Sequence, residues 1–151
     1  MAKLPPGVCS SVQNLAEVLA GAQDPWWIIG STAVALYGGS AGTIADIDVM
    51  TSRRDLAALY ERLPLTDTPE RGKDMFTSDL FGRWSEPALD VEFMAGLKLR
   101  VRGEWQLIEL ETRVPVRLRG ETVFVPDKAE LIAILTRFGR PKDLARAATL
   151  A

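Results

Sequence analysis

The chain has 151 residues, and its 18 basic and 20 acidic side chains give a formal net charge of −2, which argues against a strongly basic surface for binding long nucleic acids. There are no histidines and there is one cysteine, so histidine-based catalysis, most zinc sites and an intramolecular disulfide are excluded. The length suits one domain over residues 1–151.

The first half of the chain predicts helices that alternate with strands. Apolar residues recur at helical spacing after Ser10 and Ser11, and this helix is expected to end at Gly21. The segments that follow are a strand at 26–30, a helix at 32–37, a strand at 45–49 and a helix from Ser52 to Pro64.

The second half predicts fewer helices and more irregular structure. Residues 66–87 are polar and broken, so we expect a loop with one strand at most, and residues 89–93 then alternate as a strand. A hairpin is expected over 112–126, followed by a helix at 128–138 that Asp127 and Glu130 cap, and by a short helix that Pro141 begins. These elements favour an α+β sandwich.

The location is expected to be cytoplasmic. The start of the chain lacks the basic end and apolar core of a signal peptide, and one cysteine suits a reducing compartment. The longest apolar runs fall well short of the ~20 residues of a membrane-spanning helix, so no membrane partner is expected.

Two carboxylates lie one residue apart on a predicted strand. Asp46 and Asp48 would point to the same face about 6.6 Å apart, because a strand rises ~3.3 Å per residue and alternates its side chains. A second acidic strand carries Asp90 and Glu92 in the same alternation. Acids gathered in this way favour a hard cation such as Mg²⁺, which is usually held by carboxylates and by the phosphates of the substrate.

A candidate phosphate site lies just before these acids. Gly30 and Ser31 follow an apolar strand and precede a helix, where free backbone amides attract anions and glycine allows close approach. Structural explanations are open for the same residues: solvated acids paired with Arg53 or Arg54, and Ser31 as a helix cap only.

Together these motifs resemble the polymerase-β-like nucleotidyltransferase superfamily, in which Gly-Gly or Gly-Ser precedes Asp-apolar-Asp and a third carboxylate lies on a later strand. Residues 123–132 and 140–144 are similar to the C-terminal helices of its abortive-infection and aminoglycoside-modifying branches. The resemblance implies a nucleotidyltransferase fold, with helices packed on a mixed sheet and helices at the C-terminus.

The resemblance also implies roles for individual residues. Asp46, Asp48 and Asp90 would bind Mg²⁺ or Mn²⁺ and catalyse transfer from a nucleoside triphosphate, with Asp90 helping to deprotonate the acceptor. Gly30, Ser31 and Lys142 would bind the nucleotide, although Lys142 also fits a charged helix end. The acceptor is expected to be the hydroxyl of a small molecule, an RNA end or a protein.

Two family positions differ in this chain. The arginine that often precedes the acidic pair is absent, and residues 133–135 are apolar where a lysine is common. These differences leave an alternative: a catalytically weak protein with the same fold that acts by binding, such as one component of a toxin–antitoxin pair.

Overall fold

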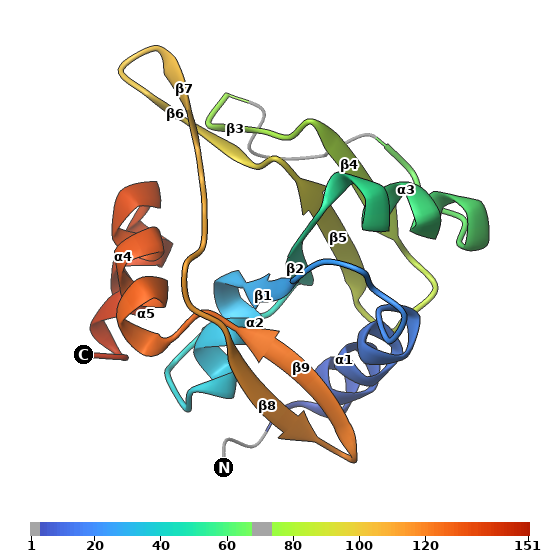
Figure 1. The fold of residues 1–151 in the computed structure, drawn as a ribbon. Coiled ribbons are helices and arrows are strands. Elements are labelled where there is room, and N and C mark those ends of the chain that lie inside the picture. Colours follow the sequence, from blue (N-terminus) through green and yellow to red (C-terminus); the bar gives the residue numbers. More distant parts are fainter. Residues whose placement is uncertain (1–3, 68–73) are drawn as a thin grey trace.

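The structure, a computed structural model, describes residues 4–67 and 74–151. Helices and strands alternate in the first half of the chain, and two helices end it (Figure 1). Among the described helices, none is both long and apolar enough to cross a membrane. The elements are α1 (Pro6–Val18), β1 (Trp27–Ile29), α2 (Gly30–Leu36), β2 (Asp46–Thr51), α3 (Arg53–Arg62), β3 (Phe76–Thr77), β4 (Leu80–Trp84), β5 (Asp90–Ala95), β6 (Lys98–Val101), β7 (Glu104–Leu107), β8 (Val114–Leu118), β9 (Glu121–Val125), α4 (Lys128–Phe138) and α5 (Pro141–Ala148).

A mixed sheet with the strand order β1-β2-β5-β4 forms the centre of the fold. β2 and β5 run parallel, whereas β1 and β4 pair antiparallel with their neighbours. Ile47, Val49, Val91 and Phe93 are fully buried in the larger core, where they alternate with acids as the sequence predicts. Because successive side chains on a strand point to opposite faces, the acids of β2 and β5 share the other face.

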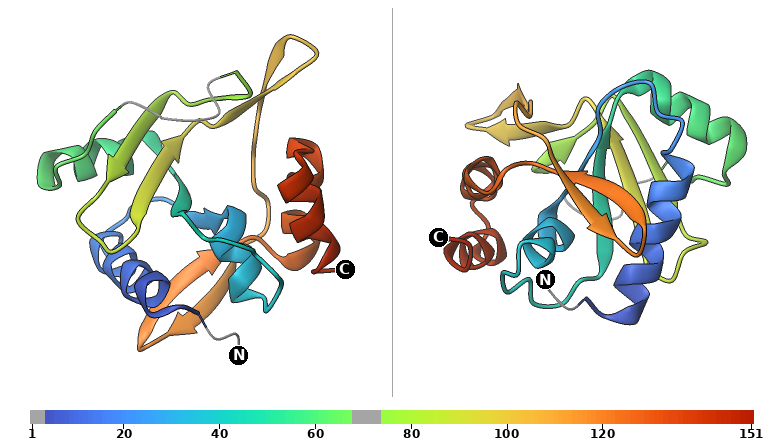
Figure 2. Two further views of the ribbon diagram at one scale, coloured as in Figure 1. Left: turned by 180° about the vertical axis from the view of Figure 1, so that it is seen from behind. Right: turned by 60° about the horizontal axis from the view of Figure 1, so that its bottom comes forward.

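The two faces of this sheet are covered unequally. The larger core joins α1, α2, α3 and β9 to the face that carries Ile47. On the acidic face, Ile29 and Met50 join a smaller cluster that includes Leu99 of β6 and Phe138 of α4. Figure 2 shows α4 and α5 side by side, on the other side of the molecule from α3. The acids therefore lie on the face with the smaller apolar cover.

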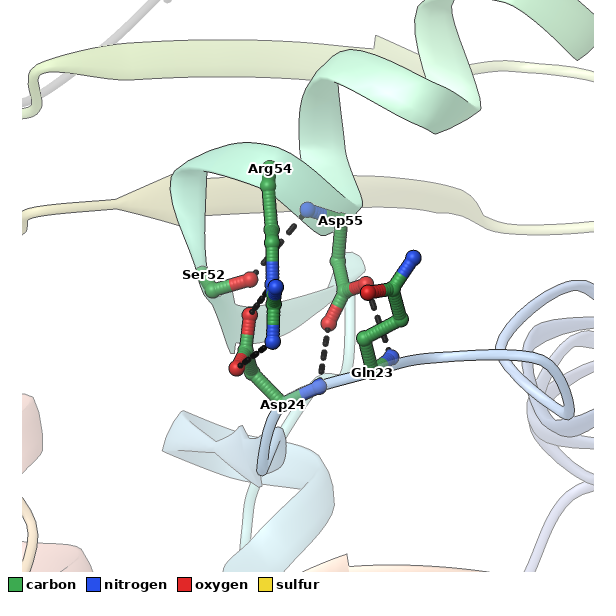
Figure 3. A network of polar contacts seen from close by, with 5 residues as sticks. All are labelled: Gln23, Asp24, Ser52, Arg54 and Asp55. Atoms are coloured by element: carbon green, nitrogen blue, oxygen red, sulfur yellow. Dashed lines mark hydrogen bonds and ion pairs between the residues drawn. The ribbon is translucent and has the colours of Figure 1, made fainter.

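A polar network connects the loop before β1 to the start of α3 (Figure 3). The Asp55 carboxylate accepts hydrogen bonds from the backbone N–H groups of Gln23 and Asp24, both at 2.9 Å. Asp24 in turn receives two hydrogen bonds from Arg54, at 2.6 and 2.8 Å. Ser52 caps α3 by accepting from the Asp55 N–H, and the helix begins next to Ser52, as the sequence predicts. The network fixes the chain that enters β1 beside the end of β2.

α1 begins earlier than the sequence pattern predicts. It starts at Pro6 rather than after Ser11, because a proline lacks the N–H that the first turn of a helix leaves unpaired. Ser11 is buried within the helix, where its hydroxyl donates to the Gly7 carbonyl at 2.7 Å and accepts from the Leu89 N–H at 2.9 Å. Ser11 thus supports the chain that enters β5.

The expectation of a loop with one strand over 66–87 is wrong in its second half. Residues 74–87 contain β3, which pairs with β6, and β4, which pairs with β5 along its whole length. Gly82 lies where an added Cβ would be 2.9 Å from a Leu65 side-chain carbon, so tight packing explains a glycine in this strand. Residues 68–73 lie outside the described part of the chain.

The C-terminal elements agree closely with expectation. The hairpin forms from β8 and β9, α4 spans 128–138 and ends at Gly139, and α5 begins at Pro141. Asp127 caps α4 by accepting from the Glu130 N–H at 2.8 Å. The Glu130 carboxylate, however, accepts from the N–H groups of Glu111 and Thr112 and so ties α4 to the segment before β8.

Candidate metal centre

Three carboxylates meet on the face of the central sheet that has the smaller apolar cover. Asp46 and Asp48 lie on β2, and Glu92 lies on β5 directly opposite Asp48 in the parallel register. One oxygen from each of the three lies within 4.8 Å of the others, and all three residues are partly buried. Hard oxygen ligands at this spacing suit Mg²⁺ or Mn²⁺, so the donor set fits the metal expected from the sequence.

The electrostatics of this group favour a bound cation. The pKa of Asp48 is raised to about 8, first by burial, then by the charges of Asp46 and Glu92, and also by a side-chain hydrogen bond with Glu92. The positive charge of Arg140 acts in the opposite direction. Like charges held close together disfavour full ionisation, and a divalent cation would remove that penalty.

Gly30 lies against Asp48 at the junction of β1 and α2. Its φ of +68° is in the left-handed region, and a Cβ added there would lie 2.9 Å from Asp48 Oδ2. Ser31 is the partly exposed second residue of α2, and the N-cap is Ile29, which makes no side-chain cap bond. Ser31 is therefore not the cap of this helix, which removes the capping explanation for it.

The close acidic group of the described residues contains Glu92 rather than Asp90. Asp90 shares the face and lies opposite Asp46 in the register, but its side chain is 45% exposed and its Oδ2 is 3.9 Å from Arg83 Nε. The alternation along residues 89–93 places both acids on one face. It does not show which one lies opposite Asp48, since that depends on the register of β5 against β2.

Arg83 is a neighbour of the site that the sequence does not reveal. It lies on β4 opposite Glu92, and its Nη2 and Nε donate to Glu92 Oε2 at 2.9 and 3.2 Å. Its side chain is only 9% exposed. The one available signal was a lone arginine between apolar residues, in a segment expected to be mainly loop.

The start of α5 brings positive charge towards the acids. Arg140 is hydrogen-bonded to the Asp143 carboxylate at 2.6 and 3.0 Å, its Cζ lies 5.2 Å from the centre of the Phe76 ring, and its charge lowers the pKa of Asp48. Lys142 is exposed on the first turn of the same helix. In contrast, Arg54 pairs with Asp24, not with the acids of β2.

Comparison with known proteins gives structural matches only. No protein-family model matches the chain, and no curated protein matches it by sequence. A protein from Thermotoga maritima that is assigned as a nucleotidyltransferase matches with a TM-score of 0.72 and 18% identity, over 92% of this chain and 89% of that one. The fold extends over nearly the whole of both chains.

An antibiotic adenylyltransferase and an antibiotic-resistance factor have a similar architecture. The lincosamide antibiotic adenylyltransferase LnuA matches with a TM-score of 0.61 and 8% identity, over 93% of this chain and 94% of that one. The antibiotic-resistance factor ANT(2'')-Ia matches with a TM-score of 0.59 and 14% identity, over 94% of this chain and 80% of that one. The chain therefore has the nucleotidyltransferase fold, with the mixed sheet and C-terminal helices expected from its sequence.

Proposed function

We propose that this protein is a metal-dependent nucleotidyltransferase that moves a nucleoside monophosphate from a nucleoside triphosphate to an acceptor hydroxyl. The observation that carries the proposal is the group formed by Asp46, Asp48 and Glu92, placed against Gly30 on a nucleotidyltransferase fold. A purely structural sheet gains nothing from three carboxylates within 4.8 Å, because their repulsion destabilises the folded state.

Asp46, Asp48 and Glu92 would hold Mg²⁺ or Mn²⁺. When bound, the metal would stabilise negative charge on the attacking and leaving oxygens of an in-line displacement. The acceptor oxygen would form a bond to the α-phosphorus while the bond from that phosphorus to the bridging oxygen breaks, so that pyrophosphate leaves. Asp90, on the same face and more exposed, stays the proposed acceptor of the hydroxyl proton.

The nucleotide is proposed to lie between the sheet and α5. Gly30 and Ser31 would contact the β and γ phosphates, since Gly30 presents its backbone beside Asp48 and Ser31 is free of a capping role. Lys142 would approach the phosphates from α5, and the charge of Arg140 already acts on Asp48. Positive groups opposite the acids would neutralise a triphosphate that the metal only partly neutralises.

The test combines binding with transfer. Each of the four nucleoside triphosphates, labelled at the α-phosphate, is incubated with the protein, Mg²⁺ or Mn²⁺ and pools of small-molecule, RNA and protein acceptors, and pyrophosphate release and label transfer are measured. Binding of a non-hydrolysable triphosphate with Mn²⁺ is followed by calorimetry. We expect Asp48→Asn to abolish both signals, because it removes a metal ligand.

Asp24→Asn is the matched control, since Asp24 is an ion-paired aspartate of a separate network and its loss should leave both signals intact. Wild-type binding in Asp48→Asn would contradict the proposed site. Metal-dependent binding without transfer to any acceptor would instead support the alternative of a catalytically weak protein that acts by binding.

A further inference from the structure

Arg83 is a nearly buried cation that contacts the acidic group from the neighbouring strand. Its side chain is 9% exposed, and Glu92, the closer of its two ion-pair partners on β5, is 21% exposed. We propose that Arg83 is a positioning residue that orients Glu92 as the third ligand of the metal. This inference rests on the proposed function, because it concerns the same metal site.

The hydrogen bonds from Arg83 to Glu92 are asymmetric. Nη2 and Nε both donate to Oε2 of Glu92, at 2.9 and 3.2 Å. One carboxylate oxygen thus receives both bonds, while an oxygen of Glu92 lies within 4.8 Å of oxygens of Asp46 and Asp48. Two donors of one rigid guanidinium therefore hold Oε2 of Glu92 in place, with a directionality that the compact charge of a lysine would not provide.

The backbone of Arg83 is itself fixed from both sides. Its register partner on β5 is Glu92, so the two side chains leave adjacent strands on the same face. On its other edge, the Arg83 N–H donates to the Thr66 carbonyl at 2.7 Å and the Thr66 N–H donates to the Arg83 carbonyl at 3.0 Å. The arginine is thus held before any ligand binds.

Glu92 is longer than the two aspartates of the acidic group, so a hydrogen bond that orders its carboxylate should matter more for it. Glu92 has one more rotatable bond than Asp46 or Asp48, so ordering its carboxylate at a metal carries a larger entropic penalty. Residues that hydrogen-bond a metal ligand commonly contribute 10–100-fold to metal affinity. If Arg83 acted through its charge alone, the effect on metal affinity would have the opposite sign. A nearby cation repels Mg²⁺, so removal of the arginine should then strengthen metal binding. The sign of the effect separates the two roles.

The experiment measures Mn²⁺ binding by the full chain, by calorimetry and by electron paramagnetic resonance, in wild type, Arg83→Met and Arg83→Lys. We expect Arg83→Met to bind Mn²⁺ about 10–100-fold more weakly. Arg83→Lys keeps the charge but not the planar fork, so we expect an intermediate affinity. Arg54→Met removes a two-bond arginine–aspartate pair elsewhere and should bind Mn²⁺ like wild type.

A double-variant cycle tests whether Arg83 acts through Glu92. Arg83→Met in a Glu92→Gln background should weaken Mn²⁺ binding no further, because the ligand that the arginine positions is already altered. Circular dichroism and thermal unfolding identify the variants that fold. If Arg83→Met does not fold, the Mn²⁺ affinity of Arg83→Lys tests the inference. Wild-type or tighter affinity in every folded Arg83 variant would overturn the inference. A wild-type protein that binds no Mn²⁺ would instead overturn the proposed function.

Discussion

Gly30 links backbone conformation to the geometry of the acids. We predict that Gly30→Ala destabilises the fold by more than the ~1–2 kcal/mol that a left-handed conformation adds for a residue with a Cβ, because the new methyl group would also lie 2.9 Å from Asp48 Oδ2. Displacement of that carboxylate should weaken Mn²⁺ binding at least about tenfold, by analogy with the loss of a ligand-orienting contact. Chemical denaturation and calorimetry measure the two effects.

Gly42→Ala is the matched control for this variant. Gly42 has a φ of +70°, close to the +68° of Gly30, but a Cβ added there meets no atom within 4 Å. It should therefore show the conformational destabilisation without the loss of metal affinity. Equal Mn²⁺ affinity in the two variants would mean that the contact between Gly30 and Asp48 has no part in the site.

At the residue scale, the sequence predicts well on which face of the sheet an acid lies. It predicts poorly which residues of other strands lie beside that acid. Strand alternation is local, so Asp46, Asp48, Asp90 and Glu92 could all be placed on one face, as the structure confirms. The choice of Glu92 over Asp90 as the partner of Asp48 depends on the register between strands far apart in the sequence. Arg83 was missed for the same reason, because its ion pair forms only when β4 pairs with β5.

At the element scale, a substitution at the start of α2 should affect phosphate binding without affecting the stability of the helix. We predict that Ser31→Ala changes the free energy of unfolding by no more than about 0.5 kcal/mol, because Ser31 does not cap the helix and alanine has the higher helix propensity. The affinity for a non-hydrolysable triphosphate with Mn²⁺ should nevertheless fall. Denaturant unfolding and calorimetry of the same samples distinguish the two effects.

Ser10→Ala provides the comparison for that measurement, since Ser10 is a helical serine of α1 whose hydroxyl donates only to the Gly7 carbonyl in the described contacts. It should leave triphosphate affinity unchanged. Ser31→Asp extends the test by placing a negative charge near the phosphates, and it should abolish binding in a folded protein. Undiminished affinity in both Ser31 variants would show that the phosphates bind elsewhere.

The elements that the sequence predicts well are those whose signals are local. α4 has its cap at Asp127 and its stop at Gly139, and the spacing between them gave both ends correctly. β4 has no such signal, because Gly82 and Arg83 are atypical of a strand. The reasons for those residues are the packing of Leu65 and the ion pair with Glu92, which exist only in the folded chain.

At the scale of the whole molecule, the fold keeps one face of its sheet available for charge. The larger core covers the face of Ile47 and Val49. The smaller cluster lies beside the acids on the opposite face. The α5 helix then brings the charge of Arg140 to bear on Asp48 from the end of the chain. Binding sites commonly lower the stability of a fold, because their like charges repel one another when no ligand is bound.

The acidic group should make the stability of the metal-free protein depend on pH. The pKa of Asp48 is raised from 3.8 to about 8 in the folded state, so between these values the folded protein holds a proton that the unfolded chain has released. The free energy of unfolding should therefore fall as pH rises from about 4 to about 8. Asp24 should affect stability in a different pH range. Its pKa is lowered to about 2, chiefly by the hydrogen bond from Arg54, so the stability that it contributes is lost only below about pH 4.

Thermal unfolding at pH 5, 6, 7 and 8 in the presence of a chelator measures this dependence. We expect the melting temperature of the wild type to fall across the series and that of Asp48→Asn to change much less, because asparagine needs no proton. Saturating Mn²⁺ should reverse the wild-type trend, since the metal binds the deprotonated carboxylate and its affinity rises with pH. If the metal-free wild type and Asp48→Asn show the same slope, burial of Asp48 among like charges does not control the stability of the molecule in this range.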